Sequence, residues 1–285
     1  MSFTLIKGTF HVKGYSPDGD SIRFKAKDSA NWKKLSGPAV SLNALEHAQL
    51  RVEAVDALET HYGGYHQPLK QAKAAGRFLL STLGIHEVVW DGPQSTIIKA
   101  EDGTEGYILA RTTESNHRPV AFVFAGETGS EDGKEVLLDA SMLKESLNYK
   151  LVERGLAYPT YYNGLFSDLR LAFTDAMSRA REGGKGVWPG DKTTVGFSVS
   201  DLGTLTDETA ILPKLFRRIM DYMGAGGKID GFKDHLLKNC EPLVRIKEAH
   251  FTRLDAVVEV NGDTVKMTEP PENLIFVDKV MCKKS

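Results

Sequence analysis

The strongest constraint on the fold is the alternation of apolar and polar residues at the start of the chain. The run TLIKGTFHVKGYSPDGDSIRFKAK, residues 4–27, alternates on both sides of a turn-rich centre. Because the side chains of a strand point alternately to its two faces, this pattern predicts two strands joined by a turn. The run AQLRVEAVDALE, residues 48–59, alternates in the same way and predicts a further strand.

The remaining segments predict an α+β order of elements. Apolar residues at helical spacing predict a helix over 69–83, followed by Gly84 as a stop signal. Strands are expected within 86–92, 106–113 and 118–126, and helices within 140–157 and 166–184. Beyond these, 212–227 and 229–239 have helical character, and Asn261-Gly262 predicts a hairpin with a type I′ turn. We place a domain boundary near residue 195, which gives domains 1–194 and 195–285.

Composition bounds the class of protein. The chain has 285 residues, of which 41% are hydrophobic and 26% charged, as is usual for a soluble globular protein. The formal net charge of -2 gives no global basic field that would draw the protein to nucleic acid. Two cysteines, Cys240 and Cys282, cannot form a disulfide framework. They could pair with each other, but two free thiols are expected. No signal peptide or membrane-spanning run is evident, so we expect a cytoplasmic protein without a membrane partner.

Acidic residues stand at two strand boundaries. Asp18-Gly19-Asp20 precedes one strand, and on its own this triplet is typical of a solvated turn. The second run carries Arg51, Asp56 and Glu59, where the alternative is a surface strand with scattered charges. Arg51 and Asp56 differ by five positions, so an unbroken strand would place them on opposite faces. A turn or bulge near Asp56 would be needed to re-aim the carboxylates.

Five motifs in order resemble the staphylococcal-nuclease-like, or thermonuclease, family over about residues 1–190. They are Asp18-Gly19-Asp20-Ser21, the run from Arg51 to Glu59, HRPVAFVF at 117–124, NYKLVERGLAYPTYY at 148–162 and SRAREGGKGVW at 178–188. The resemblance implies an α+β fold, in which a five-stranded OB-type β-barrel packs with three helices. Residues 195–285 lie beyond the resemblance and are expected to form a small mixed α/β segment.

The activity that the resemblance implies is calcium-dependent hydrolysis of phosphodiester bonds in DNA or RNA. The carboxylates of Asp20 and Asp56 and the carbonyl of Ala57 would bind Ca²⁺, a cation that prefers oxygen ligands. Asp18 and Ser21 would support these ligands. In the same scheme, Arg51 and Arg118 would bind phosphate, Glu59 would orient or deprotonate the attacking water, and Tyr161 and Tyr158 would contact the substrate.

The chain also departs from the family pattern. Leu58 stands in place of a proline, and His117 stands in place of a glycine. The segment EGYILAR competes for the third motif, and it would make Arg111 the second arginine. These departures leave open a non-catalytic nucleic-acid- or protein-binding module on the same fold. Lys214, Arg217 and Arg218 are expected on a solvated helix face.

Overall fold

The computed structural model describes residues 2–92, 96–205 and 209–277. The chain divides into two compact units, and both are discontinuous in sequence. Unit 1 comprises Met1–Glu53 and Ala74–Leu151, and unit 2 comprises Ala54–Lys73 and Val152–Ser285. Residues 152–194, assigned above to the first predicted domain, therefore lie in the same unit as the C-terminal segment. Within the described residues, no helix has the length and apolar character needed to cross a membrane.

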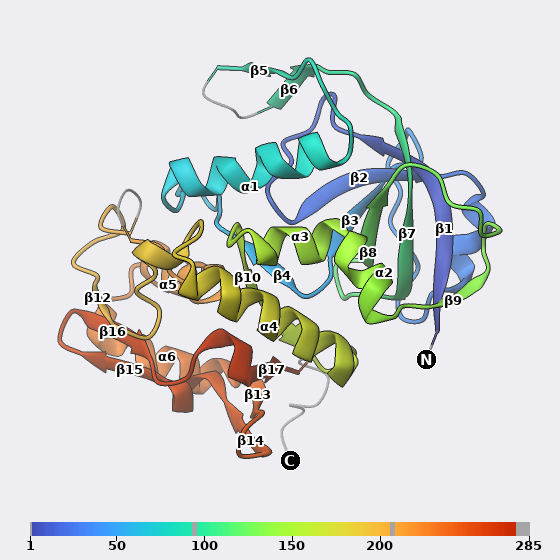
Figure 1. The fold of residues 1–285 in the computed structure, drawn as a ribbon. Coiled ribbons are helices and arrows are strands. Elements are labelled where there is room, and N and C mark those ends of the chain that lie inside the picture. The colour runs from blue at the N-terminus through green and yellow to red at the C-terminus, as the bar shows by residue number, and fades with distance from the viewer. Residues whose placement is uncertain (1, 93–95, 206–208, 278–285) are drawn as a thin grey trace. The chain divides into compact units, whose positions relative to one another are not determined.

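Unit 1 contains a closed five-stranded β-barrel (Figure 1). Its strands in spatial order are β1 (Ser2–His11), β2 (Ser21–Ala26), β3 (Ala48–Val52), β8 (Pro119–Ala125) and β7 (Thr104–Thr113). β1 pairs with both β2 and β7, and this double pairing closes the barrel. All five pairs are antiparallel except β3–β8, which is parallel. The predicted α+β class is confirmed, and the mixed barrel is compatible with an OB-type fold.

The alternating sequence produces the barrel core. Phe10, Phe24 and Leu50 are fully buried, whereas their chain neighbours remain partly exposed. Gly8 is required where β1 crosses β2, because a Cβ there would lie 2.0 Å from the carbonyl oxygen of Lys25. The neighbouring strands therefore approach more closely at this point than any residue with a side chain would allow.

Smaller elements complete the first part of the fold. β9 (Glu135–Leu137) pairs with β1, and β5 (Val89–Asp91) pairs with β6 (Thr96–Lys99). α1 (Leu69–Thr82) is the helix predicted over 69–83, and Gly84 follows with a φ of 70°. The expected helix within 140–157 is two helices, α2 (Ala140–Glu145) and α3 (Leu147–Glu153). Ser146 separates them because its hydroxyl accepts the backbone N–H of Tyr149, at 3.1 Å, at the start of α3.

The described residues of unit 2 after Val152 form three helices, and with β4 they form three short sheets. β4 (Val55–Ala57) pairs antiparallel with β10 (Ala157–Pro159). The four-stranded sheet consists of β11 (Tyr161–Tyr162), β17 (Leu274–Phe276), β13 (Pro242–Arg245) and β14 (His250–Arg253). The three-stranded sheet consists of β12 (Phe197–Ser198), β16 (Thr264–Met267) and β15 (Val258–Asn261). The helices are α4 (Ser167–Glu182), α5 (Pro213–Gly224) and α6 (Phe232–Asn239).

The hairpin predicted near Asn261-Gly262 is present, but its turn lies one residue later. Asn261 pairs with Thr264, so Gly262 and Asp263 occupy the two central positions. Only Gly262 has a positive φ, of 62°, whereas a type I′ turn needs positive φ at both positions. Glycine at the first central position is the pattern of a type II′ turn.

Candidate functional site

Three of the predicted motifs lie on neighbouring barrel strands in unit 1. β2 follows the Asp18–Ser21 turn, β3 carries Arg51, and β8 begins just after Arg118. Ser21 pairs directly with Arg51 across β2 and β3, and Arg51 pairs with Val120 across β3 and β8. The barrel therefore places Ser21 and Arg51 in one row, and Arg118 stands just before the strand that pairs with Arg51.

Asp18 organises the turn that leads into β2. Its Oδ1 accepts the hydroxyl hydrogen of Ser21, at 2.8 Å, and the backbone N–H of Asp20, at 3.3 Å. Asp20 itself is half-buried at the start of the strand. Asp18 therefore stabilises this turn, by bonds that a purely structural turn would also make.

Arg118 is held by an acid of its own hairpin. Its Nε donates to Oε1 of Glu114 at 3.1 Å. Burial raises the pKa of Glu114, but the hydrogen bond and charge of Arg118 and the charge of Arg51 outweigh it and lower that pKa. Glu114 therefore lies within the field of both predicted phosphate-binding arginines. The alternative residue, Arg111, lies on β7, which is not a neighbour of β3, and its guanidinium covers the ring of Phe3.

A break in the second motif separates its arginine from its acids. Glu53 and Ala54 interrupt the run between β3 and β4, and Ala54 adopts a φ of 65°. A left-handed alanine is uncommon and redirects the chain. The turn anticipated near Asp56 is thus present two residues earlier, and β4 carries Asp56 with only 4% of its surface exposed.

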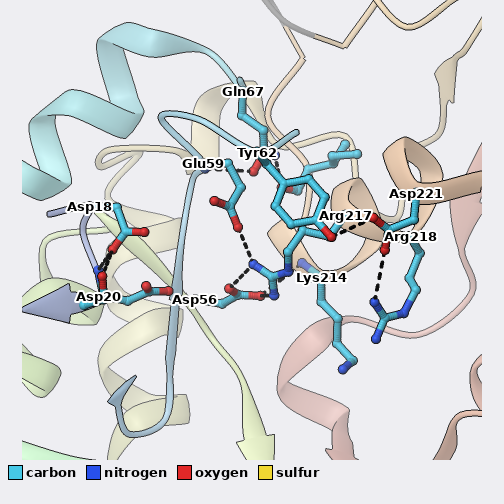
Figure 2. A network of polar contacts seen from close by, with 12 residues as sticks. Asp18, Asp20, Asp56, Glu59, Tyr62, Gln67, Lys214, Arg217, Arg218 and Asp221 are labelled. Carbon is cyan, nitrogen blue, oxygen red and sulfur yellow. Dashed lines mark hydrogen bonds and ion pairs between the residues drawn. The ribbon is translucent and has the colours of Figure 1, made fainter. Parts of the chain in front are cut away.

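In unit 2, the two acids of this motif converge on one guanidinium (Figure 2). Nη1 of Arg217 donates to Oδ1 of Asp56 at 3.0 Å, and Nη2 donates to Oδ2 at 3.1 Å. The same Nη1 donates to Oε1 of Glu59 at 2.5 Å. Bidentate arginine–carboxylate pairs are among the strongest hydrogen-bonded contacts in proteins. The predicted metal ligand and the predicted water-activating residue are therefore both bound to α5.

Asp56 also caps the helix that supplies this arginine. The backbone N–H of Lys214, in the first turn of α5, donates to Oδ2 of Asp56 at 3.0 Å. Leu212, which stands at the cap position, has no side chain able to accept such a bond. A carboxylate at a helix N-terminus satisfies an otherwise unpaired donor and interacts favourably with the helix dipole. Asp56 therefore has a structural role that is independent of any metal.

The loop after β4 is fixed to α5 and to the segment before it. Gln67 is fully buried, accepts the N–H of Glu59 at 3.2 Å and donates to the carbonyl of Ile211 at 2.8 Å. The hydroxyl of Tyr62 donates to Asp221 at 2.7 Å. Burial, followed by this bond, raises the pKa of Tyr62 to about 12. The sequence motifs contain no signal for these contacts, because their partners lie more than a hundred residues away.

The expectation of a solvated basic face on α5 is wrong. Lys214 is 6% exposed and forms an ion pair with Glu241, which also accepts Nε of Arg218 at 2.7 Å. Burial opposes ionisation of Glu241, but the charge of Lys214 and the hydrogen bond from Arg218 lower its pKa to about 2. Burial also disfavours a charged Arg217, yet Asp56 and Glu59 outweigh it and raise its pKa well above its ordinary value. All three basic side chains of this turn face acids of unit 2.

Both tyrosines predicted to contact substrate are buried. Tyr158 pairs with Asp56 across β10 and β4, and its hydroxyl donates to Asp191 at 2.9 Å. The hydroxyl of Tyr161 lies 2.8 Å from Oγ1 of Thr174. Burial is the main cause that raises the pKa of each phenol. In this conformation neither ring is open to stack on a base, and both contribute to packing.

The unit 2 residues do not offer a calcium site in this arrangement. Both carboxylate oxygens of Asp56 and one of Glu59 accept hydrogen bonds from Arg217. A cation at the same oxygens would face the positive guanidinium at close range. Ala57 lies in β4, where it pairs with Ala157. Across residues 2–92, 96–205 and 209–277, no group of three or more His, Cys, Asp or Glu side chains is placed to hold a metal ion.

Comparison with known proteins gives no further assignment. No protein-family model matches the chain, and no curated protein matches it.

Proposed function

We propose that the chain is a nucleic-acid-binding protein of the staphylococcal-nuclease-like type, in which Arg217 replaces calcium as the partner of the acid pair. The observation that supports this proposal is that the Arg217 guanidinium donates to both carboxylate oxygens of Asp56 and also to Glu59. In this conformation Arg217 occupies both carboxylate oxygens of Asp56 and one of Glu59, which disfavours binding of a cation at those oxygens. Binding without cleavage is the function that this geometry supports best.

The barrel and its arginines support nucleic acid as the ligand. A closed barrel compatible with the OB type is a frequent scaffold for oligonucleotides, although a fold alone does not decide a function. Arg51 and the strand that follows Arg118 are neighbours in the sheet, as two phosphate contacts would require. Arginine suits that role because its fork matches phosphate oxygens. The chain's net charge of -2 makes a local patch, rather than a global field, the source of affinity.

A calcium-dependent nuclease is the second candidate, and one observation favours it. Asp56 and Glu59 reach the same guanidinium nitrogen, so their carboxylates already converge as the acids of a metal site would. In this reading, the described arrangement is a closed state, and activity would follow displacement of Arg217.

A cleavage and binding assay separates the two candidates. Labelled single-stranded DNA and RNA are incubated with the protein in Ca²⁺ and in chelator, with a calcium-dependent nuclease as positive control. The proposal expects intact strands and the same binding anisotropy in both conditions. Chelator-sensitive cleavage by the folded protein would reject the proposal in favour of the nuclease. Absence of any binding would reject both.

A further inference from the structure

A small polar pocket lies on the outer side of the barrel in unit 1. Its volume is about 180 Å³, and its lining includes His11, Tyr15, Ser21, Arg23 and Gln49. This is roughly the volume of six water molecules in the liquid. A pocket of that size has room for one phosphate group with its waters.

The pocket is built from one row of the barrel. Arg23 on β2 pairs with His11 on β1 and with Gln49 on β3. Side chains of register partners leave the same face of a sheet, and residues two positions apart share that face. Ser21 and Arg51 form the next row on that face. The pocket is therefore continuous, within unit 1, with the row that carries the predicted phosphate-binding arginine.

The guanidinium of Arg23 lies over the ring of Tyr15 and has no acidic partner among the described residues. Its guanidinium lies 5.1 Å from the centre of the Tyr15 ring, and it makes no hydrogen bond or ion pair with a described residue. Six other arginines have carboxylate partners, namely Arg118, Arg181, Arg217, Arg218, Arg245 and Arg253. Arg23 thus presents an unneutralised fork, already ordered over an aromatic ring, to the pocket.

The ring beneath Arg23 is fixed by a chain of hydrogen bonds. The Tyr15 hydroxyl accepts the side-chain amide of Asn43 at 2.6 Å and lies 3.1 Å from Nδ1 of His47. Burial lowers the pKa of His47, and the charge of a protonated His11 lowers it further, so a neutral His47 can accept from Tyr15. The rings of His11 and His47 stack with centroids 3.9 Å apart. One wall of the pocket is therefore rigid before any ligand binds.

Two acids that contact lining residues of this pocket have partners other than Arg23. Asp102 lies 2.9 Å from Nδ1 of His11 and accepts the backbone N–H of Val12. Asp18 accepts the hydroxyl of Ser21 and the N–H of Asp20. Neither acid is paired with Arg23, so neither directly neutralises the charge of its guanidinium.

We infer that this pocket binds a backbone phosphate of a single-stranded nucleic acid, with Arg23 as its principal contact and Gln49 as a second donor. The inference rests on the proposed function and adds to it a binding position outside the predicted site. A bound phosphate would also explain why Arg23 lacks an acidic partner, because two phosphate oxygens can accept hydrogen bonds from its guanidinium. A base could stack on the outer side of the guanidinium, but the phosphate contact requires no particular base.

The test measures the affinity for a labelled oligothymidine by anisotropy over a range of salt concentrations. Arg23→Gln removes the fork from a side chain without an ion pair, and the exposed Arg77→Gln is the control with the same change in net charge. Arg23→Gln is expected to weaken binding about tenfold to hundredfold. It should also reduce the slope of log affinity against log salt by about 0.7, the value for one lost phosphate contact on a single strand. Arg77→Gln should change neither quantity.

A second variant tests the geometry. Gln49→Glu places a carboxylate on the register partner of Arg23, so it should pair with that guanidinium and weaken binding as Arg23→Gln does. If the unchanged protein binds the strand and both variants match it in affinity and slope, the pocket is not a phosphate site. If the unchanged protein does not bind at all, the proposed function itself fails. Inorganic phosphate alone should compete only at millimolar concentration or above, since a single anion lacks the neighbouring backbone contacts.

Discussion

The guanidinium of Arg217 binds the carboxylate of Asp56 through two hydrogen bonds, with N–O distances of 3.0 and 3.1 Å, although the two residues are 161 positions apart in the sequence. Asp56 is almost fully buried, and the side chain of Arg217 is 25% exposed. Taking such charges out of water is costly, so each residue depends on the other for its charge to be tolerated. This mutual dependence underlies the first two predictions.

Arg217→Gln is expected to lower the free energy of unfolding by about 3 kcal/mol, because it leaves two largely buried carboxylates without their cation. Urea unfolding followed by circular dichroism measures this loss. Lys233→Gln, on the exposed surface of α6, removes the same charge and should stay within about 0.5 kcal/mol of the unchanged protein. Equal effects of the two substitutions would contradict a structural role for Arg217.

Asp56→Asn, added to Arg217→Gln, is expected to recover more than about 1 kcal/mol of that loss. The amide removes the unpaired buried charge, and its oxygen can still accept the N–H of Lys214 at the start of α5. The same urea experiment on both single variants and the double variant completes the cycle. Additive losses would show that the two residues do not act on each other.

Acid should weaken the protein through Glu241. Its pKa is lowered to about 2 in the fold from an ordinary value of 4.5, so its stabilisation is complete above about pH 4.5 and is lost as the pH falls towards 2. A shift of that size is worth on the order of 3 kcal/mol. The difference in unfolding free energy between the unchanged protein and Glu241→Gln should therefore shrink as the pH falls through this window. A constant difference from pH 7 to pH 2.5 would disprove the assignment.

Calcium is expected to leave the melting temperature of the unchanged protein unaltered. A ligand present at a hundred times its dissociation constant would stabilise the fold by about 2.7 kcal/mol, which a thermal melt detects readily. The melt is repeated in Ca²⁺ and in chelator for the unchanged protein and for Arg217→Gln. If Ca²⁺ raises the melting temperature of Arg217→Gln and chelator does not, the acids can bind the metal once the guanidinium is gone, as the nuclease alternative requires.

Gly8→Ala should disrupt the barrel. The added Cβ would lie 2.0 Å from the carbonyl oxygen of Lys25 and 2.6 Å from the ring of Phe24, so two paired strands would have to separate. A loss of more than about 2 kcal/mol is expected. Gly129→Ala is the matched control, since a Cβ at that position would have nothing within 4 Å and its φ is not in the left-handed region. Similar stability of both variants would refute the argument from close approach.

Local patterns were sufficient to predict much of the barrel. Alternation around the Asp18 turn correctly indicated β1 and β2, and helical spacing located α1 and α4. These patterns report which face of one element is buried. They contain no information on where the chain leaves one compact unit for the other, and so the change of unit at Ala54 was not foreseen.

The partners of the acids could not be predicted for a related reason. Arg217 stands next to Arg218 in an amphipathic helix, where adjacent charged residues are normally solvated. Its carboxylate partners stand on β4 and in the loop that follows it, and these meet α5 only in the folded chain. The resemblance also directed attention to residues 1–190, whereas the contact that decides the state of the acids comes from beyond them.

The discontinuity of unit 2 has a consequence for the order of events on the ribosome. Asp56 and Glu59 are synthesised about 160 residues before Arg217, the side chain that neutralises them. At a translation rate of about 5–20 residues per second, that interval lasts on the order of ten to thirty seconds. β10, the strand with which β4 pairs, is synthesised about 100 residues after β4 and therefore precedes Arg217. Asp56 and Glu59 are therefore without their guanidinium partner until α5 has been synthesised.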